Sequence, residues 1–92
     1  CHGPAALLSA HGSDGFAFAG RRLAVFTDEE ERTGGTGVNT PWFVASRLQE
    51  LGAVLESGEP WTSVVVRDGN LISGQNPQSS EAVARELISA LA

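Results

Sequence analysis

The sequence contains no lysine, and all six of its basic residues are arginine. Its eleven acidic residues give a formal net charge of −5 at pH 7. The arginines form no basic stripe along the chain, so we expect no nucleic acid as the main partner. No apolar run approaches the roughly 18 residues that a membrane-spanning helix requires, so we expect no membrane insertion either.

Cysteine is almost absent, because Cys1 is the only one among 92 residues. A single cysteine excludes an internal disulfide and is consistent with a reducing compartment, so we expect a cytoplasmic protein. No signal peptide, internal repeat or low-complexity tract is visible. The glycine-rich segment 33–39 lacks the Gly-Lys-Ser/Thr ending of a phosphate-binding loop, so it predicts only a flexible loop. We expect no cofactor and no metal.

The chain opens with Cys1-His2-Gly3-Pro4, followed by an apolar run to Leu8. Gly3 permits close approach of the backbone, and Pro4 suits the first turn of a helix. This order predicts a thiol on a sharp turn, followed by a short buried helix over 4–10. Unpaired N–H groups and the dipole at the helix start favour negative charge, so Cys1 should ionise more easily than a free cysteine. The alternative is a small buried hydrophobe, which lone cysteines commonly are.

A polar, acidic segment, residues 27–31, follows the short apolar stretch of residues 23–26. Residues 23–26 predict a strand buried on both faces, and Thr27 comes directly after it. Thr27 with Glu30 matches a capping box, so a helical turn should begin here. The acidic residues 28–31 are then either a solvated helix start or, because they follow the carboxyl end of a strand, part of a site.

The rest of the chain alternates helices and strands. Thr40-Pro41 predicts a helix start, with the helix running to Leu51 and Trp42 on its apolar face. Residues 53–55 predict a short strand. Two strands, 63–66 and 70–73, flank Asp68-Gly69 and predict a hairpin. Residues 79–91 predict a final helix, with a buried stripe made of Val83, Leu87, Ile88 and Leu91.

This alternation predicts an α/β domain with a largely parallel sheet. A doubly wound sheet covered on both faces usually needs more strands and helices than these, and no strand precedes the opening turn. We therefore interpret the chain as the C-terminal part of a domain. Trp61, which follows a turn, is expected to pack in the core or at its rim.

Three stretches together resemble the DJ-1/PfpI superfamily, specifically its Hsp31-like, class I glutamine-amidotransferase-like members. Their order and spacing match over essentially the whole chain, and the first and last stretches are the specific ones. The stretches are Cys1 to Leu8, Gly20-Arg21-Arg22 before Phe26-Thr27-Asp28-Glu29-Glu30-Glu31, and Asp68-Gly69-Asn70-Leu71-Ile72-Ser73-Gly74-Gln75-Asn76-Pro77.

The resemblance implies a flavodoxin-like, three-layer α/β sandwich, with residues 1–92 as the C-terminal part of a single domain that starts at the nucleophile elbow. It implies a catalytic triad of Cys1, His2 and Glu31, with Glu30 as the fallback for the acid. Family members also use a glutamate from the N-terminal half of the domain, which this sequence does not include. That missing segment is therefore an expected partner, and a homodimer is expected as well.

The activity implied by the resemblance is a glutathione-independent glyoxalase, a lyase that converts methylglyoxal to lactate, or a related deglycase. The histidine beside the cysteine and the Asn-Pro loop favour this branch. The alternative is a holding chaperone or oxidative-stress sensor that uses the same cysteine. A cysteine protease is less favoured, and so is an amidotransferase, because amidotransferases place their histidine far downstream of the cysteine.

A last alternative takes Cys1 as an N-terminal nucleophile whose own α-amine is the base. Such enzymes have a four-layer αββα core, which 92 residues of this pattern do not supply. We therefore rank it below the other readings.

Overall fold

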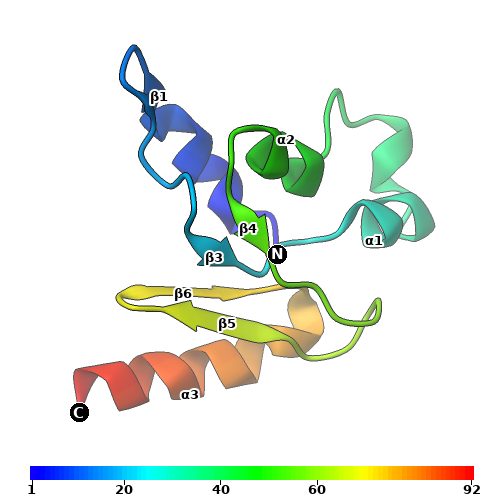
Figure 1. The fold of residues 1–92 in the computed structure, drawn as a ribbon. Coiled ribbons are helices and arrows are strands. Elements are labelled where there is room, and N and C mark those ends of the chain that lie inside the picture. The colour runs from blue at the N-terminus through cyan, green and yellow to red at the C-terminus, as the bar shows by residue number, and fades with distance from the viewer.

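The computed structural model describes all residues, 1–92. Figure 1 shows the strands β3 to β6 in the middle, with η1, α1 and α2 on one side and α3 on the other. The arrangement is a compact α/β structure whose core lies between the strands and α2. The elements are η1 Gly3–Ala10, β1 His11–Gly12, β2 Gly15–Phe16, β3 Arg22–Leu23, α1 Asp28–Thr33, η2 Thr36–Val38, α2 Val44–Glu50, β4 Val54–Leu55, β5 Val65–Asp68, β6 Leu71–Gly74, η3 Pro77–Ser79 and α3 Ser80–Leu91.

The apolar segment 23–26 is the centre of the core, and all four of its residues are buried. Its strand pairing is shorter than predicted, because β3 covers only Arg22 and Leu23, which pair in parallel with β4. Beyond β3 the segment is held by other bonds. The N–H of Ala24 donates to Ser73 Oγ at 2.9 Å, and the N–H of Phe26 donates to the carbonyl of Cys1 at 2.9 Å.

The predicted capping box at the start of α1 is confirmed. Thr27 Oγ1 accepts from the N–H of Glu30 at 3.1 Å, and the Glu30 carboxylate accepts from the N–H of Thr27 at 3.0 Å. The expectation of a solvated acidic helix start holds for Glu29, which is exposed. It is wrong for Glu30 and Glu31, which are 0% and 2% exposed. Consecutive residues of a helix point about 100° apart, so this one short helix directs two carboxylates into different parts of the interior.

Glu30 is buried and forms no salt bridge with an arginine, and hydrogen bonds are the main interactions that stabilise its charge. Its carboxylate accepts from the N–H of Thr27 at 3.0 Å, from the hydroxyl of Thr27 at 3.0 Å, from the N–H of Trp61 at 2.7 Å and from Nδ2 of Asn76 at 2.7 Å. Hydrogen bonds to a charged group contribute about 1.5–3 kcal/mol each, whereas desolvating a carboxylate costs several kcal/mol. Four such bonds therefore offset the burial, and they join three segments of the chain at one point.

Helix α2 begins later than predicted, at Val44 instead of the Thr40-Pro41 pair. Thr40 does not cap the helix, because its hydroxyl donates to the carbonyl of Thr36 at 2.9 Å. Trp42 therefore lies ahead of the helix. It is 39% exposed, and its ring lies 5.3 Å from the guanidinium carbon of Arg47. The buried face of α2 is formed by Val44, Ala45 and Leu48.

The prediction of a largely parallel sheet is wrong for this chain. Only β3 and β4 pair in parallel, while β1–β2 and β5–β6 are antiparallel hairpins. Two-residue connections can join only antiparallel strands, which is the reason for the difference. The predicted hairpin around residues 68–69 is confirmed with a shifted turn. The connection is Gly69-Asn70, with Gly69 at φ 61°, and the strands extend over 65–68 and 71–74.

Two predictions of burial are wrong. The first helix is a 3-10 helix without a buried residue, and a Cβ added to Gly3 would meet no atom within 4 Å. Helix α3 has the predicted extent, but its apolar stripe is open: Leu87, Ile88 and Leu91 are 49%, 68% and 78% exposed. Within this chain α3 packs mainly on β6 and β5, so no other element covers the part of its stripe from Leu87 to Leu91.

No helix has both the length and the apolar character needed to cross a membrane.

Replacing Glu30 by Gln should lower the free energy of unfolding by about 3 kcal/mol, because the amide leaves buried donors without an acceptor. Burial alone raises the pKa of Glu30, but the hydrogen bonds from Asn76, Trp61 and Thr27 outweigh it and hold the pKa below its usual value. A lowered folded-state pKa stabilises the protein above the unfolded value of about 4.3, and this contribution is lost as pH falls through the folded value.

The protein should therefore lose stability in urea titrations between about pH 5 and pH 3, and Glu30→Gln should lose less over that range. Tryptophan fluorescence of Trp42 and Trp61 supplies the signal. Glu29→Gln, on the exposed side of the same helical turn, is the matched control and should change stability by less than about 0.5 kcal/mol. Equal stabilities of Glu30→Gln and Glu29→Gln would contradict the role given to the Glu30 network.

Candidate functional site

Cys1 lies where a central strand position would be, between the segment 23–26 and β6. Its nitrogen donates to the carbonyl of Gly74 at 2.7 Å, and its carbonyl accepts from the N–H of Phe26 at 2.9 Å. The 3-10 helix η1 begins two residues later, with Pro4 in its first turn as predicted. The thiol thus lies directly ahead of a helix start, and the residue is partly buried.

His2 joins the thiol to the rest of the site. Its Nδ1 lies 3.2 Å from Cys1 Sγ, and its ring centroid lies 4.4 Å from that of Phe26. The His2 side chain is 49% exposed, so its ring has one face on Phe26 and access to solvent. When Nε2 carries a proton toward Glu31, Nδ1 is left as an acceptor for the thiol proton.

Glu31 contacts His2 at the ring nitrogen that does not face Cys1. Its Oε1 lies 2.7 Å from His2 Nε2, and its side chain is 3% exposed. Burial by itself raises the pKa of Glu31, but the hydrogen bonds from Thr36 and His2 and the charge of His2 together hold it below the usual value. The carboxylate is therefore ionised at neutral pH, the state that stabilises a protonated imidazole.

The structure thus brings together Cys1, His2 and Glu31, the three residues that the sequence analysis selected. Glu30, the fallback acid, is directed elsewhere: its carboxylate contacts Thr27, Trp61 and Asn76 and makes no hydrogen bond to His2. The Glu31 carboxylate therefore faces the histidine, whereas the Glu30 carboxylate connects loops of the chain.

Two residues near the site were not predicted to contribute. Thr36, in the segment expected to be only a flexible loop, donates its hydroxyl to Glu31 Oε2. Trp61 has φ 62°, a left-handed backbone that bulky residues rarely adopt, and its N–H is the donor that reaches Glu30 at 2.7 Å. Its ring packs edge-on against that of Phe26 at 5.5 Å and the residue is 38% exposed, so Trp61 lies at the rim of the core, one of the two places expected for it. No sequence signal distinguishes either residue.

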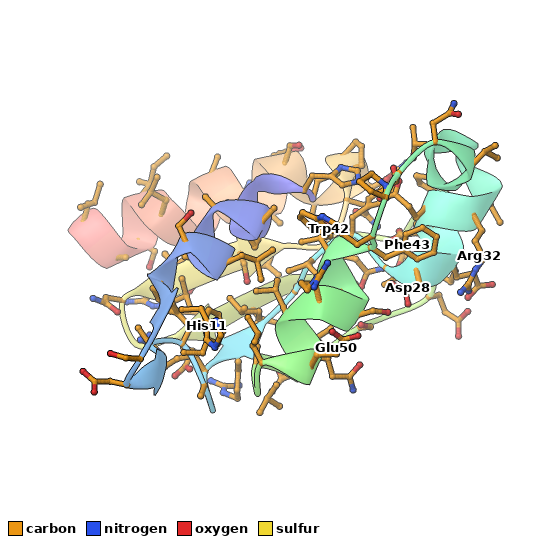
Figure 2. All side chains as sticks on the ribbon, turned by 90° about the horizontal axis from the view of Figure 1, so that it is seen from above. His11, Asp28, Arg32, Trp42, Phe43 and Glu50 are labelled. Atoms are coloured by element: carbon orange, nitrogen blue, oxygen red, sulfur yellow. The ribbon has the colours of Figure 1, made fainter.

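Two cavities open beside the site. A small one of about 160 Å³ is lined by His2, Glu31 and the 40–42 turn with Trp42. Figure 2 shows Trp42 and Phe43 ahead of α2, opposite Asp28 and Arg32 of α1. A larger cavity of about 540 Å³ is lined by Cys1 and by mainly apolar surface, whereas Cys1 does not line the small one. No group of three or more His, Cys, Asp or Glu side chains is placed to hold a metal ion.

No family model and no curated protein sequence matches the chain. Solved structures do match it. The crystal structure of APC35852 is 46% identical over 99% of this chain, with a TM-score of 0.90. The Rapid Encystment Protein of 24 kDa from Francisella tularensis is 30% identical over 100% of this chain, with a TM-score of 0.91. Glyoxalase III from Candida albicans is 28% identical over 98% of this chain, with a TM-score of 0.82.

The chain spans about two-fifths of the length of these proteins, 42%, 41% and 41% respectively. The likeness therefore covers nearly all of this chain and less than half of each similar structure.

Replacing Glu31 by Gln should make Cys1 less reactive at neutral pH. The variant loses the charge that stabilises protonated His2, and alkylation needs the thiolate. We expect the rate of alkylation by iodoacetamide at pH 7 to fall by about 10-fold, which corresponds to about 1.4 kcal/mol. The rate is measured by intact mass over a range of pH. Glu29→Gln is the control and should match the parent; a parent-like profile for Glu31→Gln would contradict the coupling.

Proposed function

The chain belongs to the DJ-1/PfpI superfamily, and on this premise we propose that the protein is a glutathione-independent glyoxalase whose nucleophile is Cys1. The observation that carries the proposal is the sequence of contacts from Cys1 Sγ through His2 to the buried carboxylate of Glu31, at 3.2 Å and 2.7 Å. A thiol, an imidazole and a carboxylate in this order form an activated nucleophile. Similarity to a glyoxalase III adds support.

In the proposed reaction the Cys1 thiolate attacks the aldehyde carbon of methylglyoxal. A carbon–sulfur bond forms, and the carbonyl oxygen takes a proton to give a hemithioacetal. A base, either His2 or an acid from another segment, then removes the proton from the former aldehyde carbon, and a proton is returned to the neighbouring carbon. The first carbon is thereby oxidised and the second reduced, which leaves a lactate thioester. Water cleaves the carbon–sulfur bond, and lactate and the thiol are released.

Each protein group has a separate part in these steps. Glu31 remains ionised and orients His2 without taking the proton, as the acid of a triad does. The N–H of His2 donates to no acceptor within the chain, so it is free to stabilise the developing oxyanion. The same thiolate chemistry extends to a deglycase.

Replacing Cys1 by Ser should reduce lactate formation from methylglyoxal by at least about 100-fold, since the step that forms the covalent bond is lost. Lactate is measured enzymatically in the intact protein. Ser9→Ala, on the exposed side of η1, is the control and should retain the parent rate. Turnover by Cys1→Ser at the parent rate would overturn the proposal. If the parent forms no lactate but suppresses aggregation of a client protein, the chaperone alternative takes its place.

We also propose that this chain is the C-terminal part of one flavodoxin-like, three-layer domain, and that the remainder of that domain covers its open apolar surfaces. The larger cavity beside Cys1 is lined by apolar side chains of η1, β6 and α3, including Leu7, Leu71 and Val83. The α3 stripe of Leu87, Ile88 and Leu91 is exposed as well. The similar structures extend well beyond this chain, so they carry a segment of the required size. A homodimer and a cytoplasmic location belong to the same proposal.

Leu87→Asp tests this coverage in the intact protein. A charge placed in an apolar interface should lower the free energy of unfolding by about 3 kcal/mol or more, whereas the same charge on an open helix face changes little. Ala84→Asp, on an exposed position of the same helix, is the matched control. Equal unfolding midpoints for the two variants would contradict the coverage. A loss of stability that disappears at high protein concentration would assign the surface to the dimer instead.

A further inference from the structure

The glycine-rich turn after α1 brings a hydroxyl onto the acid of the site. Helix α1 ends at Thr33, Gly34 and Gly35 turn the chain, and the single-turn helix η2 begins at Thr36. The Thr36 hydroxyl donates to Oε2 of Glu31, while the other carboxylate oxygen, Oε1, faces His2 Nε2 at 2.7 Å. Each oxygen of the buried carboxylate therefore has its own donor, and the two donors lie on different segments.

The backbone conformation and the close packing of this turn explain why it contains glycines. Gly35 has φ 86°, which side chains other than glycine rarely adopt. A Cβ at Gly37 would lie 3.1 Å from the carbonyl oxygen of Glu31 and 3.2 Å from Cζ of Phe43. The turn therefore folds back against α1 more closely than most residues would permit. This close approach is what allows the short Thr36 side chain to reach the Glu31 carboxylate.

We propose that Thr36 is a positioning residue, which fixes the orientation of the Glu31 carboxylate toward His2 and so sets the readiness of Cys1 to react. The inference rests on the function proposed above only for its effect on turnover. A carboxylate that accepts a hydrogen bond through only one oxygen can rotate about its last carbon–carbon bond. Its hydrogen bond to His2 then loses the optimal direction. A second donor, on the other oxygen, holds the plane of the group and stabilises its charged form.

The burial of Glu31 increases the effect of losing the hydrogen bond from Thr36. Glu31 is 2% exposed, so water does not readily replace a donor that is removed. The hydroxyl belongs to an exposed residue, and the hydrogen-bond partner of Cys1 Sγ is His2 and not Thr36. Thr36 therefore acts on the thiol only through Glu31 and His2. A loss of the hydroxyl should change the reactivity of Cys1 without removing any group that touches the substrate.

The test compares Thr36→Val, which removes the hydroxyl at nearly constant volume, with Thr36→Ser, which keeps it. Thr33→Val is the matched control, because the Thr33 hydroxyl bonds only backbone carbonyls of α1, such as that of Glu29 at 3.1 Å. All are made in the intact protein. The measurements are the iodoacetamide alkylation rate of Cys1 from pH 5 to 9, and kcat and KM for methylglyoxal.

Thr36→Val should slow alkylation at neutral pH by about 3- to 10-fold, shift the midpoint of the alkylation curve to higher pH, and lower kcat by a similar factor with little change in KM. Thr36→Ser should restore the parent profile to within about 2-fold, and Thr33→Val should match the parent. The restoration by serine excludes a merely structural effect of the substitution.

An alkylation profile of Thr36→Val that coincides with the parent, or a profile of Thr36→Ser that is as altered as that of valine, would overturn the inference. A parent protein that forms no lactate would refute the glyoxalase proposal alone, because the alkylation curves still decide the role of Thr36. Should Thr36→Val fail to fold, Thr36→Ala and Thr36→Ser provide the same comparison of a missing and a retained hydroxyl.

Discussion

The buried carboxylate of Glu30 is the contact on which the arrangement of the site depends. It caps its own helix through Thr27 and also accepts from Trp61 and Asn76, so one charge joins the start of α1 to the loops after β4 and after β6. No arginine forms a salt bridge with it, and its stability comes mainly from hydrogen-bond donors whose positions are determined by the fold. A charge of this kind tolerates little displacement, because every donor that moves away leaves a desolvation cost uncompensated.

This constraint determines where the neighbouring residue lies. With Glu30 held inward by the loops, the next residue of α1 is turned by about 100° toward the start of the chain, where His2 lies. The position of Cys1 does not depend on Glu30, because its backbone is hydrogen-bonded to Gly74 on one side and to Phe26 on the other. The spacing between nucleophile, histidine and acid is thus a result of the core. The strained backbone of Trp61, at φ 62°, is one cost of directing its N–H at Glu30.

The two sides of the structure differ in how completely they are covered. The side that carries the His2–Glu31 contact is closed by α1, η2 and the turn before α2, and among its buried side-chain oxygen and nitrogen atoms only Asp28 Oδ1 has no hydrogen-bond partner. The opposite side, around the larger cavity and along α3, presents leucine, isoleucine and valine side chains to solvent. Large exposed apolar patches are uncommon on the surfaces of soluble proteins, so this is the side that the proposed remainder of the domain would cover.

The sequence by itself determined the local features: the capping box at Thr27, a hairpin whose turn it placed one residue early at Asp68-Gly69, the extent of α3, and the choice of Cys1, His2 and Glu31 as one group. These depend on residues close in the chain, or on motifs specific enough to carry a resemblance. The tertiary structure placed Glu31 against His2, as the resemblance implied, and directed Glu30, the fallback acid, to Trp61 and Asn76, because a helix points neighbouring residues in different directions. It alone placed Thr40 on a carbonyl instead of a helix start, left the stripe of α3 uncovered, and brought Thr36 onto Glu31. These outcomes depend on how the chain folds back on itself and on which surfaces other elements cover, and composition and spacing do not specify either.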